Sequence, residues 1–186
     1  RIRVQPAGRE SKVARIVTAD GDLPRAVAGQ SVTLTLADEI DISRGDIIST
    51  VDNPASVADQ FEATVVWMAE DAMLPGRRYL LKVGGQTVNA EIGHLKYKVN
   101  VNTLERTAAN KLDLNEIGVL NMALDKAIAF DPYSENRDTG GFILIDRISN
   151  ATVAAGMIHF ALRRASNIHM QALDIDKAAR RQLKGQ

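Results

Sequence analysis

The sequence predicts an all-β protein that contains two small antiparallel Greek-key β-barrels and a short C-terminal helix. Short runs rich in Val, Ile, Leu and Thr alternate apolar with polar residues, which is the period of a strand with one buried face. Turn residues separate these runs at intervals of about ten residues, a spacing typical of sandwiches and barrels. A helical pattern occurs only near the end of the chain. Closed barrels also leave few exposed sheet edges.

The first barrel is predicted over residues 1–53 and is expected to be partial. Ile2 and Val4 alternate with polar residues from the outset, so the chain opens inside a strand. A natural N-terminus seldom begins in this way, and we expect the chain to be a fragment of a longer protein. Further strands are predicted at residues 12–19, 31–37 and 44–51.

The second barrel is predicted over residues 54–171. A polar linker at 51–60, which contains the turn-forming pair Asn53-Pro54, separates it from the first. Two strands over 142–162 are expected to meet at a turn formed by Ser149 and Asn150. The predicted inward-facing residues are apolar and evenly spaced: Phe61, Ala63, Val65, Trp67, Val88, Ala90, Ile92, Leu95, Tyr97, Val99, Val101, Leu120, Met122, Leu124, Ile128 and Phe130.

The tail at 172–186 is predicted to be a helical linker. Asp174 or Asp176 can cap its start, and Gly185 can end it. Ala178, Ala179 and Leu183 give it a narrow apolar stripe.

Composition excludes several classes of protein. The chain has 186 residues, of which 45% are hydrophobic and 25% charged, the balance of a globular protein. Lys and Arg together number 23, as do Asp and Glu, so no net charge draws the chain to nucleic acid or to an anionic membrane. Cysteine is absent, which removes disulfides and thiolate chemistry and fits a reducing compartment. No apolar run is long enough for a membrane helix, and we predict a cytoplasmic protein.

One short motif raises the possibility of guanine binding. Residues Asn110 to Asp113 read Asn-Lys-Leu-Asp, the tetrad with which GTPases recognise guanine. A GTPase also needs a phosphate loop of the form G-x-x-x-x-G-K-[ST], and the chain has none. The residues before the tetrad are polar, whereas a GTPase has a buried strand there. We therefore interpret the tetrad as a surface turn.

The residues do not form a recognisable catalytic or metal-binding pattern. His94, His159 and His169 are too far apart in sequence for a metal motif. The first two fall on predicted strands and are expected at the solvent face or the rim. Cysteine and a G-x-S-x-G elbow are both absent, so a nucleophilic triad is disfavoured. We predict no catalytic, cofactor-binding or metal-binding residue in this chain.

The loop at 130–141 is the best candidate for partner recognition. It carries many hydrogen-bonding groups, and binding residues are frequent on loops. Tyr133, Asn136 and Arg137 are the candidate contact residues. The alternative is an ordinary solvated loop, which has a similar composition.

Longer stretches resemble a known family. Residues 26–49, "AVAGQSVTLTLADEIDISRGDIIS", resemble the end of the second domain of translational-type GTPases, and 152–158, "TVAAGMI", resemble a strand of the third domain of elongation factor Tu. Over residues 1–171 the chain is similar to subunit 1, the large GTPase subunit, of bacterial sulfate adenylyltransferase. The tail is similar to the segment that joins this subunit to an adenylylsulfate kinase domain in bifunctional forms. The motifs that carry the likeness are "FEATVVWM", "PGRRYLLK", "VNTLE", "LNEIG", "FDPY" and "TGGFILIDRISNATVAAGMI".

This resemblance implies both a function and a set of partners. The longer protein would bind GTP and Mg²⁺ in an N-terminal domain outside this chain. A smaller catalytic subunit would join ATP and sulfate into adenylyl sulfate and pyrophosphate, driven by GTP hydrolysis, and the kinase domain would also use ATP. The barrels would contact the catalytic subunit and the GTPase domain, would need no cofactor and would be inactive alone. The family's guanine tetrad lies in the other domain, so Asn110–Asp113 would be a coincidence.

Two alternatives remain open at this point. The barrels of translation factors bind tRNA or the ribosome, and a plain interaction module with no enzymatic parent is also compatible with the fold. RNA binding should leave a clustered basic surface, which zero net charge disfavours, so we predict neither nucleic acid nor membrane as a partner. The candidate basic residues are Arg77, Arg78, Lys82, Lys96, Lys98, Arg163 and Arg164.

Overall fold

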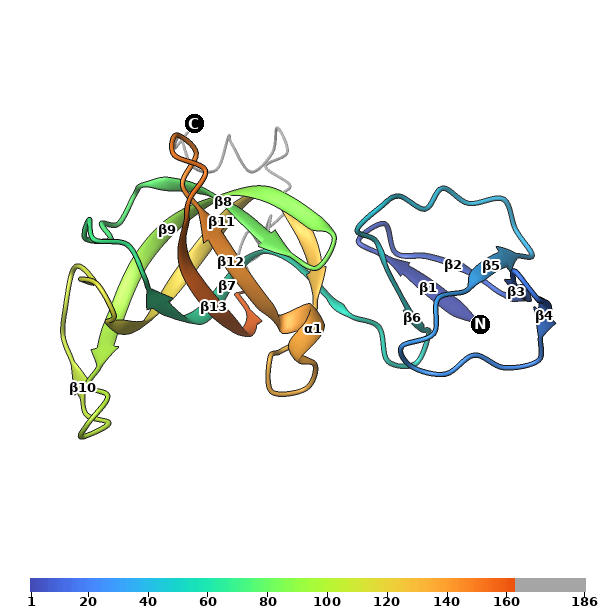
Figure 1. Ribbon diagram of the computed structural model, residues 1–186, viewed down its shortest axis with the longest axis horizontal. Helices are drawn as coiled ribbons and strands as arrows, with labels where there is room; N and C mark the ends of the chain where they lie inside the picture. The colour runs from blue at the N-terminus through green and yellow to red at the C-terminus, as the bar shows by residue number, and fades with distance from the viewer. Residues whose placement is uncertain (163–186) are drawn as a thin grey trace, which may run out of the picture.

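The computed structural model describes residues 1–162, which form an N-terminal unit and a larger barrel (Figure 1). The N-terminal unit contains β1 (Ile2–Gln5), β2 (Arg9–Ser11), β3 (Val13–Thr18), β4 (Gly21–Leu23), β5 (Thr33–Leu36) and β6 (Ile47–Thr50). The barrel contains β7 (Ser56–Trp67), β8 (Arg78–Val83), β9 (Gln86–Val99), β10 (Arg106–Thr107), β11 (Ile117–Phe130), α1 (Arg137–Gly140), β12 (Gly141–Ile145) and β13 (Thr152–Ala161).

The predicted all-β class is confirmed. The larger sheet has the order β10-β9-β11-β7-β13-β12-β8, and β8 also pairs with β9, so six strands close into an antiparallel barrel. β9 makes closure possible because its first half pairs with β8 and its second half with β11. The short β10 pairs only with the end of β9 and is not one of the six strands that close the barrel.

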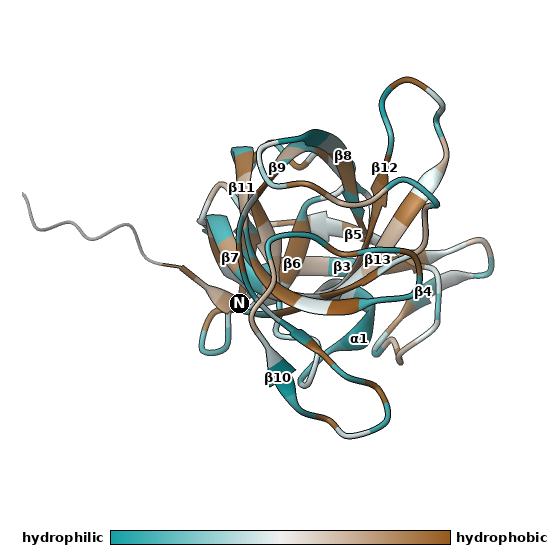
Figure 2. Cartoon of the chain, turned by 90° about the vertical axis from the view of Figure 1, so that its left-hand side faces the viewer, coloured by the Kyte–Doolittle hydropathy of each residue, from teal (hydrophilic) through white to brown (hydrophobic). Residues whose placement is uncertain are grey.

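The core follows the predicted alternation closely. Phe61, on β7, has no exposed surface, and its ring lies 5.7 Å from the rings of both Phe130 and Phe142. Trp67 packs edge-on against Tyr79 and donates its indole N–H to the carbonyl of Asp71 at 2.7 Å. Hydrophobic and hydrophilic residues alternate along the strands, as Figure 2 shows.

Four residues of the predicted inward set are not fully buried: Tyr97, Val99, Val101 and Leu124. Val101 lies beyond the end of β9 and is exposed, because the chain has already left the sheet at Val99. Leu124 is only half-buried, since the register of β11 against β7 shifts between Ala123 and Ile128.

The N-terminal unit has far less core than the barrel. Its strands form two three-stranded sheets, β2-β1-β6 and β4-β3-β5, which are not joined by a ladder within the described residues. Only Ile2, Val4, Gln5 and Ser11 are buried among residues 1–54. The apolar side chains of β3 and β5 are half-exposed. The sheet β4-β3-β5 therefore has no fully buried face.

Three predicted segments have different limits in the structure. The linker is shorter than 51–60, because Ala55 is buried and Ser56 already pairs with Phe130. The loop at 130–141 contains the short helix α1, which the polar composition did not reveal. The predicted C-terminal helix at 172–186 lies outside the described residues.

A backbone contact joins the two units. Gly45 has a φ of +99°, and a Cβ atom placed on Gly85, at the β8–β9 turn, would lie 3.0 Å from the Gly45 Cα. Gln86 fixes this turn, because its side chain donates to the carbonyl of Ala129 at 2.9 Å and accepts from the N–H of Ala129 at 3.2 Å. The two units therefore meet through the backbones of Gly45 and Gly85, which are too close for a side chain to fit between them.

A side chain at Gly85 should weaken this contact. We expect Gly85→Ala to destabilise the junction by about 1–3 kcal/mol, the usual cost of overpacking, because backbone atoms must move apart. Limited proteolysis should then cut the segment between Thr50 and Ser56 faster. Gly84→Asn is the matched control, since it keeps a left-handed residue next to open space. Equal cleavage of all three proteins would contradict a tight junction.

Candidate functional site

A groove lies on the outer face of the barrel, beside the loop that the sequence singles out. Its volume is about 560 Å³. Outward-facing side chains of β7, β12 and β13 form its floor, and most of them are apolar. The principal lining residues are Val66, Lys82, Tyr133, Ile143, Ala155 and Met157.

The strand β12, under the groove, is apolar on both faces. On β12, Phe142 and Leu144 point into the core, while Ile143 and Ile145 are half-buried on the outside. Strands of this kind are typical of sheets that are covered on both sides. The outer face of β12 and β13 is therefore suited to receive another body.

Tyr133 is held in position at the edge of the groove. Its backbone N–H donates to the carbonyl of Ile158 at 2.9 Å. Gly140 packs against its main chain so closely that a Cβ there would lie 2.5 Å from the Tyr133 Cα. Gly141 lies against the tyrosine ring at ordinary contact distance, with a hypothetical Cβ 3.4 Å from the nearest ring carbon.

Asn136 and Arg137 have different roles in the loop. Asn136 caps α1, because its side-chain oxygen accepts from the N–H of Asp138 at 3.1 Å. Asp131 supports the same turn by accepting from the Thr139 hydroxyl at 2.8 Å. Arg137 is exposed and makes no ion pair within residues 1–162. Tyr133 and Arg137 are thus available to a partner, whereas Asn136 stabilises the loop, and the contact role of all three stays a prediction.

A polar network crosses the outer face next to the groove. The Glu62 carboxylate, on β7, forms a hydrogen bond with His159 Nδ1 of β13 at 3.0 Å and an ion pair with Lys96 of β9. His159 Nε2 lies 2.8 Å from the Thr64 hydroxyl. Because its members come from β9, β7 and β13, the network ties together strands on both sides of β7. We call these four residues the Glu62 network.

Glu62 is charged despite its burial. Burial by itself raises the pKa of the carboxyl, but the hydrogen bonds from Lys96 and His159 and the positive charge of Lys96 outweigh it and hold the pKa below the ordinary value of 4.5. Sequence reasoning missed this network because Glu62 and His159 are 97 positions apart. Strand register alone brings them together.

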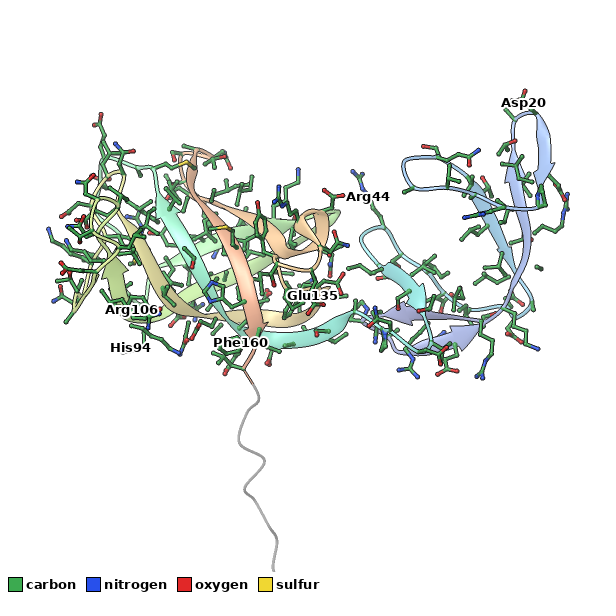
Figure 3. All side chains as sticks on the ribbon, turned by 90° about the horizontal axis from the view of Figure 1, so that it is seen from below. Asp20, Arg44, His94, Arg106, Glu135 and Phe160 are labelled. Carbon is green, nitrogen blue, oxygen red and sulfur yellow. The ribbon has the colours of Figure 1, made fainter. Side chains whose placement is uncertain are left out.

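The other histidine predictions can be compared with the structure. His94 is exposed on the outside of β9, as expected, and Figure 3 shows it among the surface side chains. His159 faces outward as predicted but is engaged by Glu62. Among residues 1–162 no three His, Asp or Glu side chains gather in a way that could hold a metal ion. The same residues contain no helix that is long and apolar enough to span a bilayer.

The Asn-Lys-Leu-Asp tetrad is a turn anchored to the barrel. Leu112 is fully buried and pairs with Met73, which fixes the segment. Lys111 and Asp113 pair with each other at 3.0 Å, and the N–H of Asp113 donates to Glu116 at 2.9 Å. The turn precedes the antiparallel strand β11, whereas a guanine-binding loop follows a parallel strand.

Comparisons with known proteins establish the class. Residues 60–159 match the model of the GTP-eEF1A C-terminal domain-like family, and the chain belongs to that family. Among solved structures, sup35 complexed with GDP superposes with a TM-score of 0.77 at 17% identity, covering 87% of this chain and 40% of that one. The likeness to sup35 concerns the fold and extends over more than the barrel alone.

Sequence relatives are more specific than the fold. The chain is 54% identical to the bifunctional enzyme CysN/CysC of Xylella fastidiosa over 98% of its own length. It is 50% identical to sulfate adenylyltransferase subunit 1 of Aliivibrio salmonicida over 82% of its length. It spans 29% and 32% of these two relatives. The predicted resemblance to the large subunit of sulfate adenylyltransferase and to the bifunctional proteins that contain it is confirmed.

The Glu62 network should make stability depend on pH. The folded-state pKa of Glu62 is lowered, so its contribution is present above the ordinary pKa of 4.5 and is lost as the pH falls through the folded value. Glu62→Gln should lower the melting temperature at pH 7 by about 2–4 °C, roughly 1 kcal/mol in a chain of this size. The difference from the wild type should shrink below pH 4.

Thermal unfolding followed by circular dichroism at several pH values measures this effect. Glu91→Gln is a suitable control, because Glu91 pairs with Arg78 in an exposed salt bridge, a kind that contributes little. A Glu62→Gln deficit that is the same at pH 7 and pH 3.5 would show that the charge is not what stabilises the network.

Proposed function

We propose that this chain is the β-barrel region of the GTPase subunit of a sulfate adenylyltransferase, where it positions other domains and performs no chemistry itself. Its 50–54% identity to curated CysN/CysC and subunit 1 proteins carries this proposal. Bifunctional relatives match 98% of the chain and the subunit 1 relatives 82%, which favours a parent fused to an adenylylsulfate kinase.

The parent would couple two reactions. Its catalytic small subunit would form adenylyl sulfate and pyrophosphate from ATP and sulfate, an uphill reaction, while its own nucleotide domain would hydrolyse GTP with Mg²⁺. A β-barrel can transmit such coupling if it makes a contact in only one nucleotide state, because only a difference in binding free energy shifts an equilibrium. The barrel would thus serve subunit contact and interdomain coupling.

The groove beside Tyr133 is where we place the contact with the nucleotide domain. The floor of the groove is mostly apolar and half-exposed. A domain that covered it would remove this apolar surface from water, which is favourable. The Gly45–Gly85 junction would hold the N-terminal unit at a fixed angle to this groove. A movement of the nucleotide domain would therefore act on both units together.

The chain alone should have no enzymatic activity. We expect the 186-residue protein neither to hydrolyse GTP nor to form adenylyl sulfate, because residues 1–162 offer a tetrad whose Lys and Asp pair with each other and the sequence has no phosphate loop. Malachite-green and pyrophosphate-release assays measure the two activities. Magnesium-dependent GTP turnover that Asp113→Ala abolishes would contradict the proposal, and RNA co-purifying with the parent would favour translation-type barrels.

Replacing the loop residues should uncouple the parent enzyme. Tyr133→Ala combined with Arg137→Ala should reduce GTP-stimulated adenylyl sulfate formation about tenfold, because a groove contact is lost while the barrel core is untouched. Arg147→Ala is the matched control, an exposed arginine in the β12–β13 turn. Stimulation at the wild-type level in the double variant would show that the loop has no part in coupling.

A further inference from the structure

A second hollow lies between the loop that joins β7 to β8 and the turn that joins β12 to β13. Its volume is about 370 Å³, and we call it the Tyr79 pocket. Direct contacts hold its two sides together, because the N–H of Met68 donates to the carbonyl of Val153 at 2.9 Å and Arg77 forms an ion pair with Asp146 at 3.0 Å. The lining residues are Trp67, Ala69, Glu70, Asp71, Arg77, Tyr79, Asp146, Ile148, Ser149, Ala151 and Val153.

The hydroxyl of Tyr79 is buried and has no hydrogen-bonding partner among residues 1–162. Tyr79 is only 1% exposed, and Asp71, Arg77 and Asp146, which all line the pocket, are the charged groups close enough to act on the hydroxyl. The hydroxyl end of the side chain therefore faces the pocket. Burial raises the pKa of this hydroxyl, so it is protonated at neutral pH and can both donate and accept. A buried polar group without a partner is unfavourable, which points to a group that the pocket receives.

The pocket carries more negative than positive charge. Asp146 is neutralised by Arg77, the one cation among the lining residues. Glu70 and Asp71 are exposed and form no ion pair within the described part of the chain. Arg147, which follows Asp146 in sequence, lines a different hollow. Two negative charges thus remain uncompensated, and they favour a cationic ligand.

The acceptors of the pocket match an ammonium group. Asp71 is held in place because its carbonyl accepts from the indole N–H of Trp67 at 2.7 Å. An ammonium group has three N–H donors and no acceptor, and the Tyr79 hydroxyl with the carboxylates of Glu70 and Asp71 supplies three acceptors. A metal ion is less suitable, since no three His, Asp or Glu side chains of residues 1–162 are arranged to hold one. Ile148, 89% exposed at the edge of the pocket, offers apolar surface to an alkyl stem.

Arg77 covers the buried hydroxyl. Its guanidinium lies 5.6 Å from the centre of the Tyr79 ring, on the way from solvent to the pocket wall. The Arg77 side chain is 46% exposed, so it can move into solvent without disturbing the core. Its departure would open the hydroxyl and would also leave the Asp146 carboxylate without its positive partner. A cation that enters the pocket would then replace the charge that Arg77 removes.

We propose that the Tyr79 pocket binds an alkylammonium group, carried either by a free amine or by a lysine side chain of another protein. The ammonium donates to the Tyr79 hydroxyl and to the carboxylates of Glu70 and Asp71 once Arg77 has moved aside. The pocket shares no lining residue with the groove beside Tyr133. This site is therefore additional to the proposed function and does not depend on it.

The test titrates the 186-residue chain with n-butylammonium chloride at constant ionic strength and follows the amide signals by NMR. We expect saturable shifts at residues 69–71 and 148–151. Tetramethylammonium has the same charge but no N–H donor, and it should shift these signals much less. Arg77→Ala should bind n-butylammonium more tightly, because the variant lacks both the cover and a like charge.

Tyr79→Phe is the decisive variant. It should bind n-butylammonium about tenfold more weakly, because one hydrogen bond to a charged group is lost. Its melting temperature should equal or exceed that of the wild type, since the hydroxyl has no partner to lose. Tyr97→Phe is the matched control, because Tyr97 lies on β9 and does not line the pocket, and it should bind normally.

A second titration identifies the source of the ammonium group. Tighter binding of cadaverine than of Nα-acetyl-lysine methylamide would assign the pocket to free amines, and the reverse order would assign it to a lysine of a partner protein.

Three results would overturn the proposal. Equal shifts with n-butylammonium and tetramethylammonium would show that charge alone attracts the ligand. Unchanged affinity in Tyr79→Phe would show that the ligand does not reach the hydroxyl. A lower melting temperature in Tyr79→Phe would show that the hydroxyl is already bonded within the fold. Each of these results would leave the proposed function intact, because that function rests on other surfaces.

Discussion

Closure of the barrel through β9 is the constraint on which the rest of the structure depends. β9 pairs with β8 along its first half and with β11 along its second, so the six-stranded sheet has no free edge in the closed part. Closure fixes which side chains point inward, and Phe61, Trp67 and their neighbours are buried there. The interior is consequently a packed core, and any function must lie on the outer face, the loops or the rim.

The outer face is divided into regions with different physical character. β12 and β13 present apolar side chains that a second body can cover. Beside them, the Glu62 network joins strands through charge-assisted hydrogen bonds. Toward the N-terminal unit, Gly45 and Gly85 meet main chain to main chain. The barrel is thus tied together across its strands by the Glu62 network and joined to its neighbouring unit by a direct backbone contact.

Much of the barrel could be predicted because the hydrophobic effect acts on a period of two residues. The alternation of Phe61, Ala63, Val65 and Trp67 gave the inward face of β7 correctly. The turn at Ser149-Asn150 was also correct, and Asn150 has the left-handed φ that such turns use. The prediction failed at α1, where a polar segment was interpreted as a loop. The cap of this helix by Asn136 depends on the backbone geometry, which the composition does not show.

By itself the sequence determined the fold class, the core faces and the family, because these depend on patterns that are local or are spread evenly along the chain. Only the tertiary structure decided which distant residues meet. Glu62 and His159 are joined by the register of β7 against β13, and Gly85 reaches Gly45 because the β8–β9 turn faces the other unit. The left-handed φ of 59° at Leu104 was likewise invisible in the sequence, since a backbone dihedral is set by the hydrogen bonds of a folded loop.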